Sequence, residues 1–271
     1  MSAKPPKESP PLLASFADDR DIGSRENQED FALCSPVGTA SGPCAEVICA
    51  LADGMGGHAG GEIASRVAVS AFVRVLKSAH PESGQEYLAM VNAAQTADAA
   101  LYRRLLSEPE ELRSMGCTLC SAWIKNGKLF FLNVGDSLVF LMRDKRLYLL
   151  NHRHNHREDM RRRAFYEGLD WGEVSRQESV VRYGARITSY LGGRGIDHAD
   201  CPAEPIQLQA GDTVLLASDG LLTLSEREIA EALLPVPGRS IHGDAEHILE
   251  CVLSKKAPKQ DNVSVVVIRM A

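Results

Sequence analysis

Short apolar runs separated by polar turns dominate the central part of the chain. Runs rich in Val, Ile, Leu and Phe predict β-strands at 30–34, 46–52, 117–124, 128–134, 138–143, 146–150, 212–218 and 262–270. The links between the central runs are short, and Asn126-Gly127 is a strong signal for a hairpin turn. The pattern therefore predicts antiparallel strands, several of them joined by hairpins.

Predicted helices form two groups, one before the central strands and one after them. The stretch 61–79 follows a glycine-rich loop, and two later helices fall near 225–234 and 244–255. The segment that follows the first helix has an apolar helical stripe, which consists of Leu88, Val91, Ala94, Leu101 and Leu105. Because strands and helices do not alternate, this order predicts an α+β fold in which helices cover antiparallel sheets.

The composition is typical of a soluble globular protein and argues against two classes of partner. Of the 271 residues, 44% are hydrophobic and 24% are charged. The net charge of −6 argues against nucleic acid, since no basic excess is present to neutralise phosphates. No apolar run approaches the roughly 20 residues that span a bilayer, which argues against membrane insertion.

The first residues differ in character from the rest of the chain. The segment 1–13 has prolines where a signal peptide has an apolar core, so we predict a flexible leader on a cytoplasmic protein. No linker or repeat divides the remainder, which predicts one domain over 14–271. We expect this domain to be a monomer.

The seven cysteines are predicted to be reduced, because no signal peptide directs the chain to an oxidising compartment. Cys117 and Cys120 form a C-x-x-C pair, which raises the alternatives of a redox site or a zinc site. Residues three apart on a strand face opposite ways, and no second pair has zinc spacing. We therefore predict that both cysteines belong to the core.

Carboxylates recur beside small or turn-forming residues at the ends of the apolar runs. Such places are found at 25–30, 51–58, 133–137, 216–220 and 259–267. An aspartate at the end of a strand is usually a turn cap, but carboxylates gathered without basic partners repel each other and favour a bound cation. An oxygen-only set suits Mg²⁺ or Mn²⁺. Gly54, next to Asp53, would let a backbone carbonyl approach the same ion.

The ordered set of short motifs resembles the metal-dependent protein phosphatases, the type 2C serine/threonine phosphatases. The matching positions are Arg25, Glu29 and Asp30, the segments 53–65, 116–118, 134–137 and 218–221, and Asp261 with Asn262. The form DGMGGH at 53–58 is similar to the bacterial branch. The resemblance implies a sandwich of two packed antiparallel sheets, with a pair of helices on each outer face, in an α-β-β-α arrangement.

The resemblance also assigns a binuclear metal centre. It implies that Asp53 bridges two Mn²⁺ or Mg²⁺ ions and that the carbonyl of Gly54 binds one of them. Asp219 and Asp261 would complete the shell of the other ion.

Four further positions take roles from the same resemblance. Glu29 and Asp30 would act mostly through metal-bound water, and Asp136 would bind a possible third ion together with Asp219. Arg25 would hold the substrate phosphate, since a guanidinium is always charged and donates bidentate pairs. The catalytic set expected from the resemblance is Arg25, Asp53, Asp219 and Asp261.

The implied reaction is hydrolysis of phosphoserine and phosphothreonine in proteins, by a hydroxide that bridges the two ions. No phosphoenzyme is expected, in agreement with the absence of a C-x5-R cysteine loop. The implied partner is a phosphoprotein, the product of a serine/threonine kinase. The main alternative is an inactive phosphoprotein-binding module of the same fold. A stress-type regulator is a third possibility, although such proteins usually carry sensor domains.

Several residues near these motifs leave alternatives open. Met55 stands where eukaryotic members have a histidine proposed as general acid, so protonation of the leaving group is expected to come from water. His58 either reaches the site or orients the glycine loop. His152, His154 and His156 alternate, so on a strand they would face one way, either as a metal site or as a solvated polar edge.

A basic stretch leads into the segment that corresponds to the variable flap of the family, at about 157–185, and overlaps its first residues. Residues 143–163 contain eight lysines and arginines against three acidic residues. A run of this kind is usually a solvated surface, and steering of acidic phosphoproteins is the alternative. Its most concentrated part consists of Arg161, Arg162 and Arg163.

Overall fold

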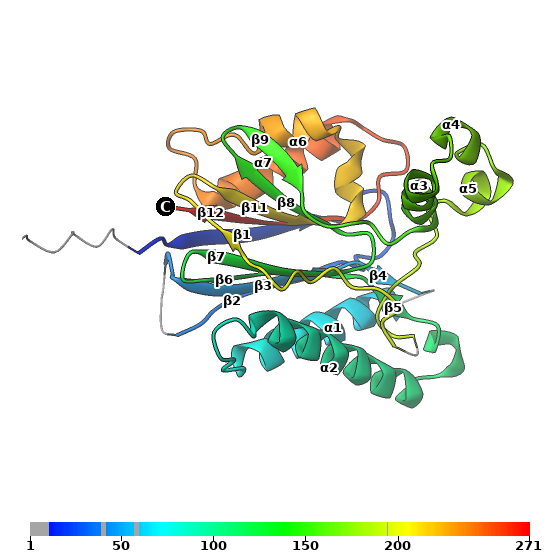
Figure 1. Cartoon of the computed structure of the whole chain (residues 1–271), viewed down its shortest axis with the longest axis horizontal. Helices are drawn as coiled ribbons and strands as arrows, with labels where there is room; N and C mark the ends of the chain where they lie inside the picture. The colour runs from blue at the N-terminus through cyan, green and yellow to red at the C-terminus, as the bar shows by residue number, and fades with distance from the viewer. Residues whose placement is uncertain (1–10, 39–41, 57–59, 194) are drawn as a thin grey trace, which may run out of the picture.

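Two five-stranded antiparallel sheets stack face to face in the computed structural model of the chain, which describes residues 11–38, 42–56, 60–193 and 195–271 (Figure 1). The first sheet has the order β1 (Ala14–Asp21), β12 (Val263–Met270), β11 (Thr213–Ala217), β8 (Leu138–Arg143) and β9 (Arg146–Leu149). The second has the order β10 (Ile206–Gln207), β7 (Lys128–Val134), β6 (Leu119–Lys125), β3 (Glu46–Ala52) and β2 (Phe31–Pro36). A separate two-stranded ladder joins β4 (Gly54–Met55) to β5 (Gly116–Cys117).

A pair of helices covers the outer face of each sheet. Helices α1 (Gly60–Lys77) and α2 (Glu86–Ser107) lie on the second sheet, and α6 (Glu226–Ala232) and α7 (Ile241–Ser254) lie on the first (Figure 1). The predicted sandwich with helix pairs outside is thereby confirmed. None of the described helices is both long and apolar enough to cross a membrane.

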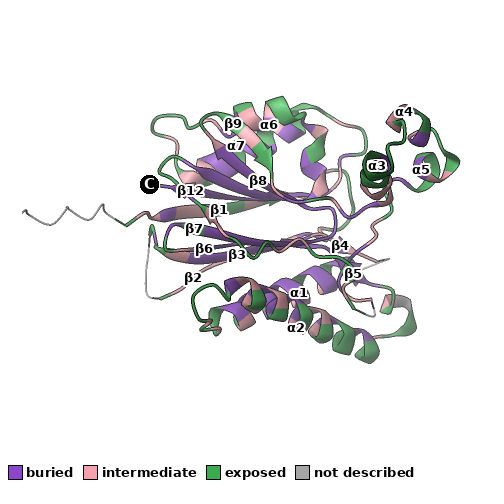
Figure 2. Ribbon diagram, in the orientation of Figure 1, coloured by how far each residue is buried: buried purple, intermediate pink, exposed green. Residues whose placement is uncertain are grey.

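The strands alternate between two apolar layers, so each sheet is buried on both faces (Figure 2). On β12, Val265 and Val267 pack toward α6 and α7, whereas Val266 and Ile268 pack toward the other sheet. The period of two residues along a strand makes this alternation possible. Three stacked apolar layers therefore hold the strand ends in fixed positions, and the candidate site is built from those ends.

Two local predictions are confirmed. Asn126 and Gly127 have φ values of 51° and 70°, which is the two-residue turn that joins β6 to β7. Cys117 and Cys120 are fully buried free thiols that belong to different apolar layers, one on each side of the second sheet. Both are core residues, as their spacing predicts.

Strand β1 was not predicted from the sequence. It pairs with β12 along its whole length, from Ala14 opposite Met270 to Asp21 opposite Val263. It is an edge strand in which only Ala14 and Ala17 are buried, so its apolar signal is weak. Leu13 also exchanges two backbone hydrogen bonds of 2.9 Å with Ala271, so contact with the domain begins before the predicted boundary at residue 14. Residues 1–10 of the predicted leader lie outside the described residues.

The flap segment folds into three short helices at one end of the sandwich, α3 (His156–Glu167), α4 (Trp171–Val174) and α5 (Glu178–Tyr183) (Figure 1). They share a small apolar cluster of their own, which consists of Ala164, Val174 and Val180. The three alternating histidines do not lie on a strand, so they do not face one way. His152 is exposed, His154 is buried, and His156 begins α3, because the helix starts where the sequence pattern suggested a strand.

The apolar stripe of α2 is also shifted relative to the prediction. Leu88 is 49% exposed, whereas Met90 and Ala97 are fully buried against the second sheet and α1. Leu101 and Leu105 are buried as predicted.

This register predicts a difference between two alanine substitutions on α2. Met90→Ala removes a fully buried side chain and leaves a cavity, so it should lower the free energy of unfolding by about 2–5 kcal/mol. Leu88→Ala should lower it by less than about 1 kcal/mol. Urea unfolding followed by circular dichroism measures both values. Equal losses would show that Leu88 is packed in the core.

Candidate metal centre

Five aspartates from distant parts of the chain act on one another at the ends of the strands. Asp53 follows β3, Asp136 lies between β7 and β8, and Asp219 begins the 3-10 helix η2 (Asp219–Thr223). Burial raises the pKa of Asp53 well above its ordinary value, and the surrounding carboxylates raise it further. Those neighbours are Asp30, Asp219, Asp136 and Asp261. The sequence-predicted carboxylates therefore do gather around Asp53.

The backbone around Asp53 is fixed by Thr118, the residue between β5 and β6. The N–H of Asp53 donates to the Thr118 hydroxyl (2.9 Å), and the N–H of Thr118 donates to the Asp53 carbonyl (2.9 Å). The Thr118 hydroxyl also shares a hydrogen bond of 2.7 Å with Ser137. Thr118 belongs to the 116–118 motif, for which the sequence predicted no role. In the structure it holds the end of β3 next to Asp53.

The glycines after Asp53 allow three backbone segments to come together. The N–H of Gly54 donates to the Glu29 carbonyl (3.2 Å), and a Cβ on Gly54 would overlap the carbonyl oxygen of Gly61 in the first turn of α1. Gly56 has a φ of +137°, which disfavours other residues. Close packing therefore accounts for glycine at residue 54. His58 lies outside the described residues.

Asn262 holds the loop that carries Arg25 and Glu29. Its side-chain amide donates to the carbonyls of Ile22 (2.9 Å) and Asn27 (3.0 Å), and its Oδ1 accepts the N–H of Glu29 (2.8 Å). All hydrogen-bonding groups of the amide except one lone pair are thus used on one loop. The motif contained Asn262, but only the fold reveals this positioning role.

Asp30 is almost completely buried beside a serine. Its Oδ2 accepts the Ser218 hydroxyl (2.7 Å), whereas Oδ1 is buried without a hydrogen-bond partner among the described residues. Burial raises the pKa of Asp30 to about 6, although the Ser218 contact acts in the opposite direction. A carboxylate that is only half satisfied in this way is costly to ionise without a cation.

The pKa of Asp219 is raised further than that of Asp30. Burial, followed by the charges of Asp136 and Asp261, raises the pKa of Asp219 to about 7. Its Oδ1 is also buried without a hydrogen-bond partner in the described part of the chain. Both orphaned oxygens are hard donors of the kind that Mg²⁺ and Mn²⁺ prefer.

Asp136 is linked to the start of the flap through Asn155. The Asn155 amide nitrogen lies 3.5 Å from Asp136 Oδ2, while its Oδ1 caps α3 by accepting the N–H of Glu158 (3.1 Å). The turn itself is held by His154, whose Nδ1 accepts the N–H of Gly135 (3.2 Å). Neither residue was predicted to contribute, although Asn155-x-x-Glu158 is a recognisable capping pattern.

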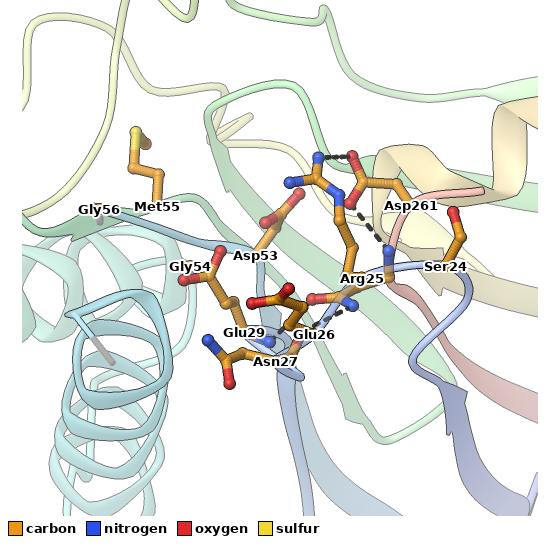
Figure 3. Close-up of a pocket in the computed structure, with 11 residues that line it drawn as sticks. Ser24, Arg25, Glu26, Asn27, Glu29, Asp53, Gly54, Met55, Gly56 and Asp261 are labelled. Carbon is orange, nitrogen blue, oxygen red and sulfur yellow. Dashed lines mark hydrogen bonds and ion pairs between the residues drawn. The ribbon is translucent and has the colours of Figure 1, made fainter. Parts of the chain in front are cut away.

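Arg25 and Asp261 lie on the wall of a cavity of about 630 Å³ beside Asp53 (Figure 3). The Arg25 guanidinium donates to Asp261 Oδ2 over 2.5 Å, and both side chains remain partly exposed. Burial is also the main cause that raises the pKa of Glu29, which lines the same cavity. Met55 also lines this cavity (Figure 3).

The residues present fit a hard divalent cation by their chemistry. No three acidic, histidine or cysteine side chains within the described ranges converge tightly enough to enclose an ion as they stand. Arg25 supplies the positive charge next to Asp261, while Asp30 and Asp219 each keep a buried oxygen that has no partner among the residues described. A bound cation would stabilise the ionised form of these carboxylates and would give the orphaned oxygens a partner.

Comparisons with known proteins agree on the family. The family model described as protein phosphatase 2C matches residues 27–242, and the chain belongs to this family. Arg25 and Asp261 lie outside the matched residues, one on either side.

Two curated relatives are named as serine/threonine phosphatases. PstP of Mycobacterium tuberculosis is 33% identical over 225 residues, which are 81% of this chain and 40% of that protein. The chain thus spans less than half of that relative's length. Stp of Listeria monocytogenes is 32% identical over 197 residues, which are 69% of this chain and 71% of that protein.

A solved structure of similar fold contains metal. It is the catalytic domain of PstP in complex with two manganese ions, and it is 27% identical in sequence with a TM-score of 0.72. The superposition covers 96% of this chain and 99% of that one.

The raised pKa of Asp219 predicts a pH-dependent gain in stability from Asp219→Asn. In the metal-free protein the folded state holds the Asp219 proton more tightly than the unfolded state does. The free energy of unfolding therefore falls as pH rises from about 4, the unfolded pKa, to about 7, the folded pKa. The amide avoids this loss, so the variant should be more stable than the wild type by about 1–3 kcal/mol at pH 8, a few degrees in Tm.

Thermal unfolding in chelator, at pH 4.5 and pH 8, measures this difference. The exposed Asp197→Asn is the matched control and should leave Tm unchanged at both pH values. Addition of Mn²⁺ should raise the Tm of the wild type more than that of Asp219→Asn. A variant that is less stable than the wild type at pH 8 would mean that Asp219 makes favourable contacts without a metal.

Proposed function

We propose that this chain is a metal-dependent phosphatase that hydrolyses phosphoserine and phosphothreonine in proteins. One observation carries the proposal: Asp53, whose pKa is raised by burial and by the surrounding aspartates, lines a 630 Å³ cavity that also presents Arg25. Membership of the protein phosphatase 2C family and the two named relatives support the same activity.

Two Mn²⁺ or Mg²⁺ ions would be held mainly by three aspartates, with Asp53 between the two ions and Asp219 and Asp261 on one of them. The carbonyl of Gly54 would bind the other ion. When bound, such ions supply acidity to a water molecule and positive charge for the phosphate oxygens. The manganese ions in the PstP structure support this assignment.

Three more carboxylates would support the ions from outside. Glu29 and Asp30 would act through water, consistent with the Ser218 contact that already engages one oxygen of Asp30. Asp136 would hold a third ion together with Asp219, and Asn155 would orient the Asp136 carboxylate.

Arg25 would exchange one anion for another during substrate binding. Without substrate its guanidinium is paired with Asp261 at 2.5 Å. Once a cation neutralises Asp261, the guanidinium is free to donate a bidentate pair to the phosphate. The contact would strengthen in the transition state, where charge builds up on the phosphate oxygens.

The lining of the cavity favours direct hydrolysis without a phosphoenzyme. The described residues that line it include neither cysteine nor histidine, and the Ser24 hydroxyl is engaged with the Gln260 carbonyl at 2.8 Å. Met55 cannot donate a proton, so water is left to protonate the leaving group.

The biological setting is proposed from the same reasoning. The substrate would be a phosphoprotein produced by a serine/threonine kinase, and the enzyme would act in the cytoplasm as a monomer. Residues 14–271 would form one phosphatase domain, with α3, α4 and α5 as its flap.

Turnover should depend entirely on a divalent metal. Hydrolysis of a phosphothreonine peptide should occur with Mn²⁺ or Mg²⁺ and vanish with chelator, and Asp53→Asn should lower kcat by several orders of magnitude. Asp197→Asn serves as the control with normal activity. Hydrolysis without metal would refute the proposal. Peptide binding without turnover under any metal condition would favour the alternative of an inactive binding module.

Arg25→Ala should lower kcat/KM for the same peptide by about a hundredfold, because it removes a contact that strengthens in the transition state. Arg25→Lys should recover only part of this loss, since an ammonium lacks the planar fork. Steady-state kinetics at saturating Mn²⁺ separates the effects on kcat and KM. Unchanged kinetics in Arg25→Ala would show that Arg25 does not bind the substrate phosphate and only pairs with Asp261.

A further inference from the structure

We propose that Arg153, Arg157 and Arg182 form a second anion-binding subsite, which receives another anionic side chain of the phosphoprotein substrate. This inference rests on the proposed function and specifies the class of substrate. The subsite is a separate pocket of about 270 Å³ on the flap side of the metal centre.

The pocket lies between the flap and the carboxylates. Arg153 precedes α3, Arg157 lies in the first turn of α3, and Arg182 lies in α5. Asp136 and Asp219 line the same pocket. A ligand in it would therefore lie next to the metal centre, as a residue close to the phosphorylated one would.

The three guanidinium groups have few partners of their own. Arg153 approaches the Glu158 carboxylate only to 3.8 Å, which is too long for a hydrogen bond. Among the described residues, the side chains of Arg157 and Arg182 have neither a hydrogen bond nor an ion pair, and the Arg182 guanidinium lies 5.3 Å from the ring centroid of Tyr183. Each guanidinium carries five N–H donors, so the pocket offers many donors to an incoming ligand.

Two of these arginines lie close to other groups that line the pocket. The Arg157 guanidinium lies against Gly184, where an added Cβ would come within 3.2 Å of its Nε. Arg153 lines the same pocket as Asp136 and Asp219, without a hydrogen bond to either among the described residues. Cations that engage these two aspartates would leave three guanidinium charges facing the pocket.

The charge of the flap as a whole does not explain this arrangement. Residues 156–186 contain seven arginines against six acidic residues, so the flap is nearly neutral. Arg163 pairs with Glu167 at 2.9 Å, whereas the side chains of Arg162, Arg176 and Arg186 have neither a hydrogen bond nor an ion pair among the described residues. Arg161 lies 3.8 Å from Glu158. What distinguishes Arg153, Arg157 and Arg182 is therefore that all three line one pocket.

The occupant should be a carboxylate or a phosphate, because planar guanidinium groups match both anions in bidentate geometry. On a protein substrate these anions come from an acidic residue or from a second phosphorylated residue. The subsite would then select substrates whose target phosphate has an anionic neighbour.

The test is the affinity of peptides that cannot be hydrolysed. Each peptide carries a phosphonate in place of the target phosphate, and a serine, a glutamate or a second phosphonate is placed one to four residues away on either side. Fluorescence anisotropy with saturating Mn²⁺ at low salt gives Kd for each. The wild type should bind the best-placed doubly anionic peptide about tenfold more tightly than its serine counterpart, a ratio expected of charge-assisted contacts.

Arg157→Ala combined with Arg182→Ala should reduce that ratio to about one. The matched control, Arg163→Ala with Arg176→Ala, removes the same charge from the flap outside the pocket and should keep the ratio. Preference for the glutamate peptide alone would identify a carboxylate subsite, and a larger preference for the second phosphonate would identify a phosphate subsite.

Two results would overturn the inference: a wild-type ratio near one at every spacing, or an equal loss in the control variant. Hydrolysis of an aryl phosphate with Mn²⁺ is measured in parallel. Its absence would count against the proposed function alone, because the affinity ratios still decide whether the subsite exists.

Discussion

Mutual repulsion among buried carboxylates is the constraint on which the rest of the site depends. Burial makes ionisation of Asp53 and Asp219 unfavourable, and each nearby aspartate adds to the cost. The apolar layers on both sides of each sheet prevent the strand ends from moving apart. A hard divalent cation removes the repulsion without rearranging the fold, so the electrostatic cost in the metal-free protein becomes affinity for metal.

Neutral side chains hold the charged ones in place. Thr118 fixes the backbone of Asp53, Asn262 fixes the loop of Arg25 and Glu29, and Ser218 satisfies one oxygen of Asp30. None of these groups adds charge, so they position the carboxylates without competing with a cation. Close backbone packing at Gly54 serves the same purpose, since it brings the ends of β3 and α1 together.

The sequence predicts the central fold well because buried strands and long helices leave strong periodic signals. It misses β1, whose pairing with β12 depends on a backbone ladder and only two buried alanines. It also does not reveal how the histidines near residue 154 are placed, because a helix cap at Asn155 interrupts their alternation. The carboxylate set could be predicted from motifs, whereas the roles of Asn155 and Asn262 depend on contacts between segments far apart in the chain.

The most direct test of this account is the number of protons released when Mn²⁺ binds. Metal ligands must be deprotonated, so carboxyls with pKa values of about 6 and about 7 should release protons on binding near pH 6 and almost none near pH 8. Isothermal titration calorimetry in buffers of different ionisation enthalpy gives this number. We expect roughly one proton or more per protein near pH 6. Tight Mn²⁺ binding with no proton release at that pH would contradict the account, because the aspartates would then be fully ionised before the metal arrives.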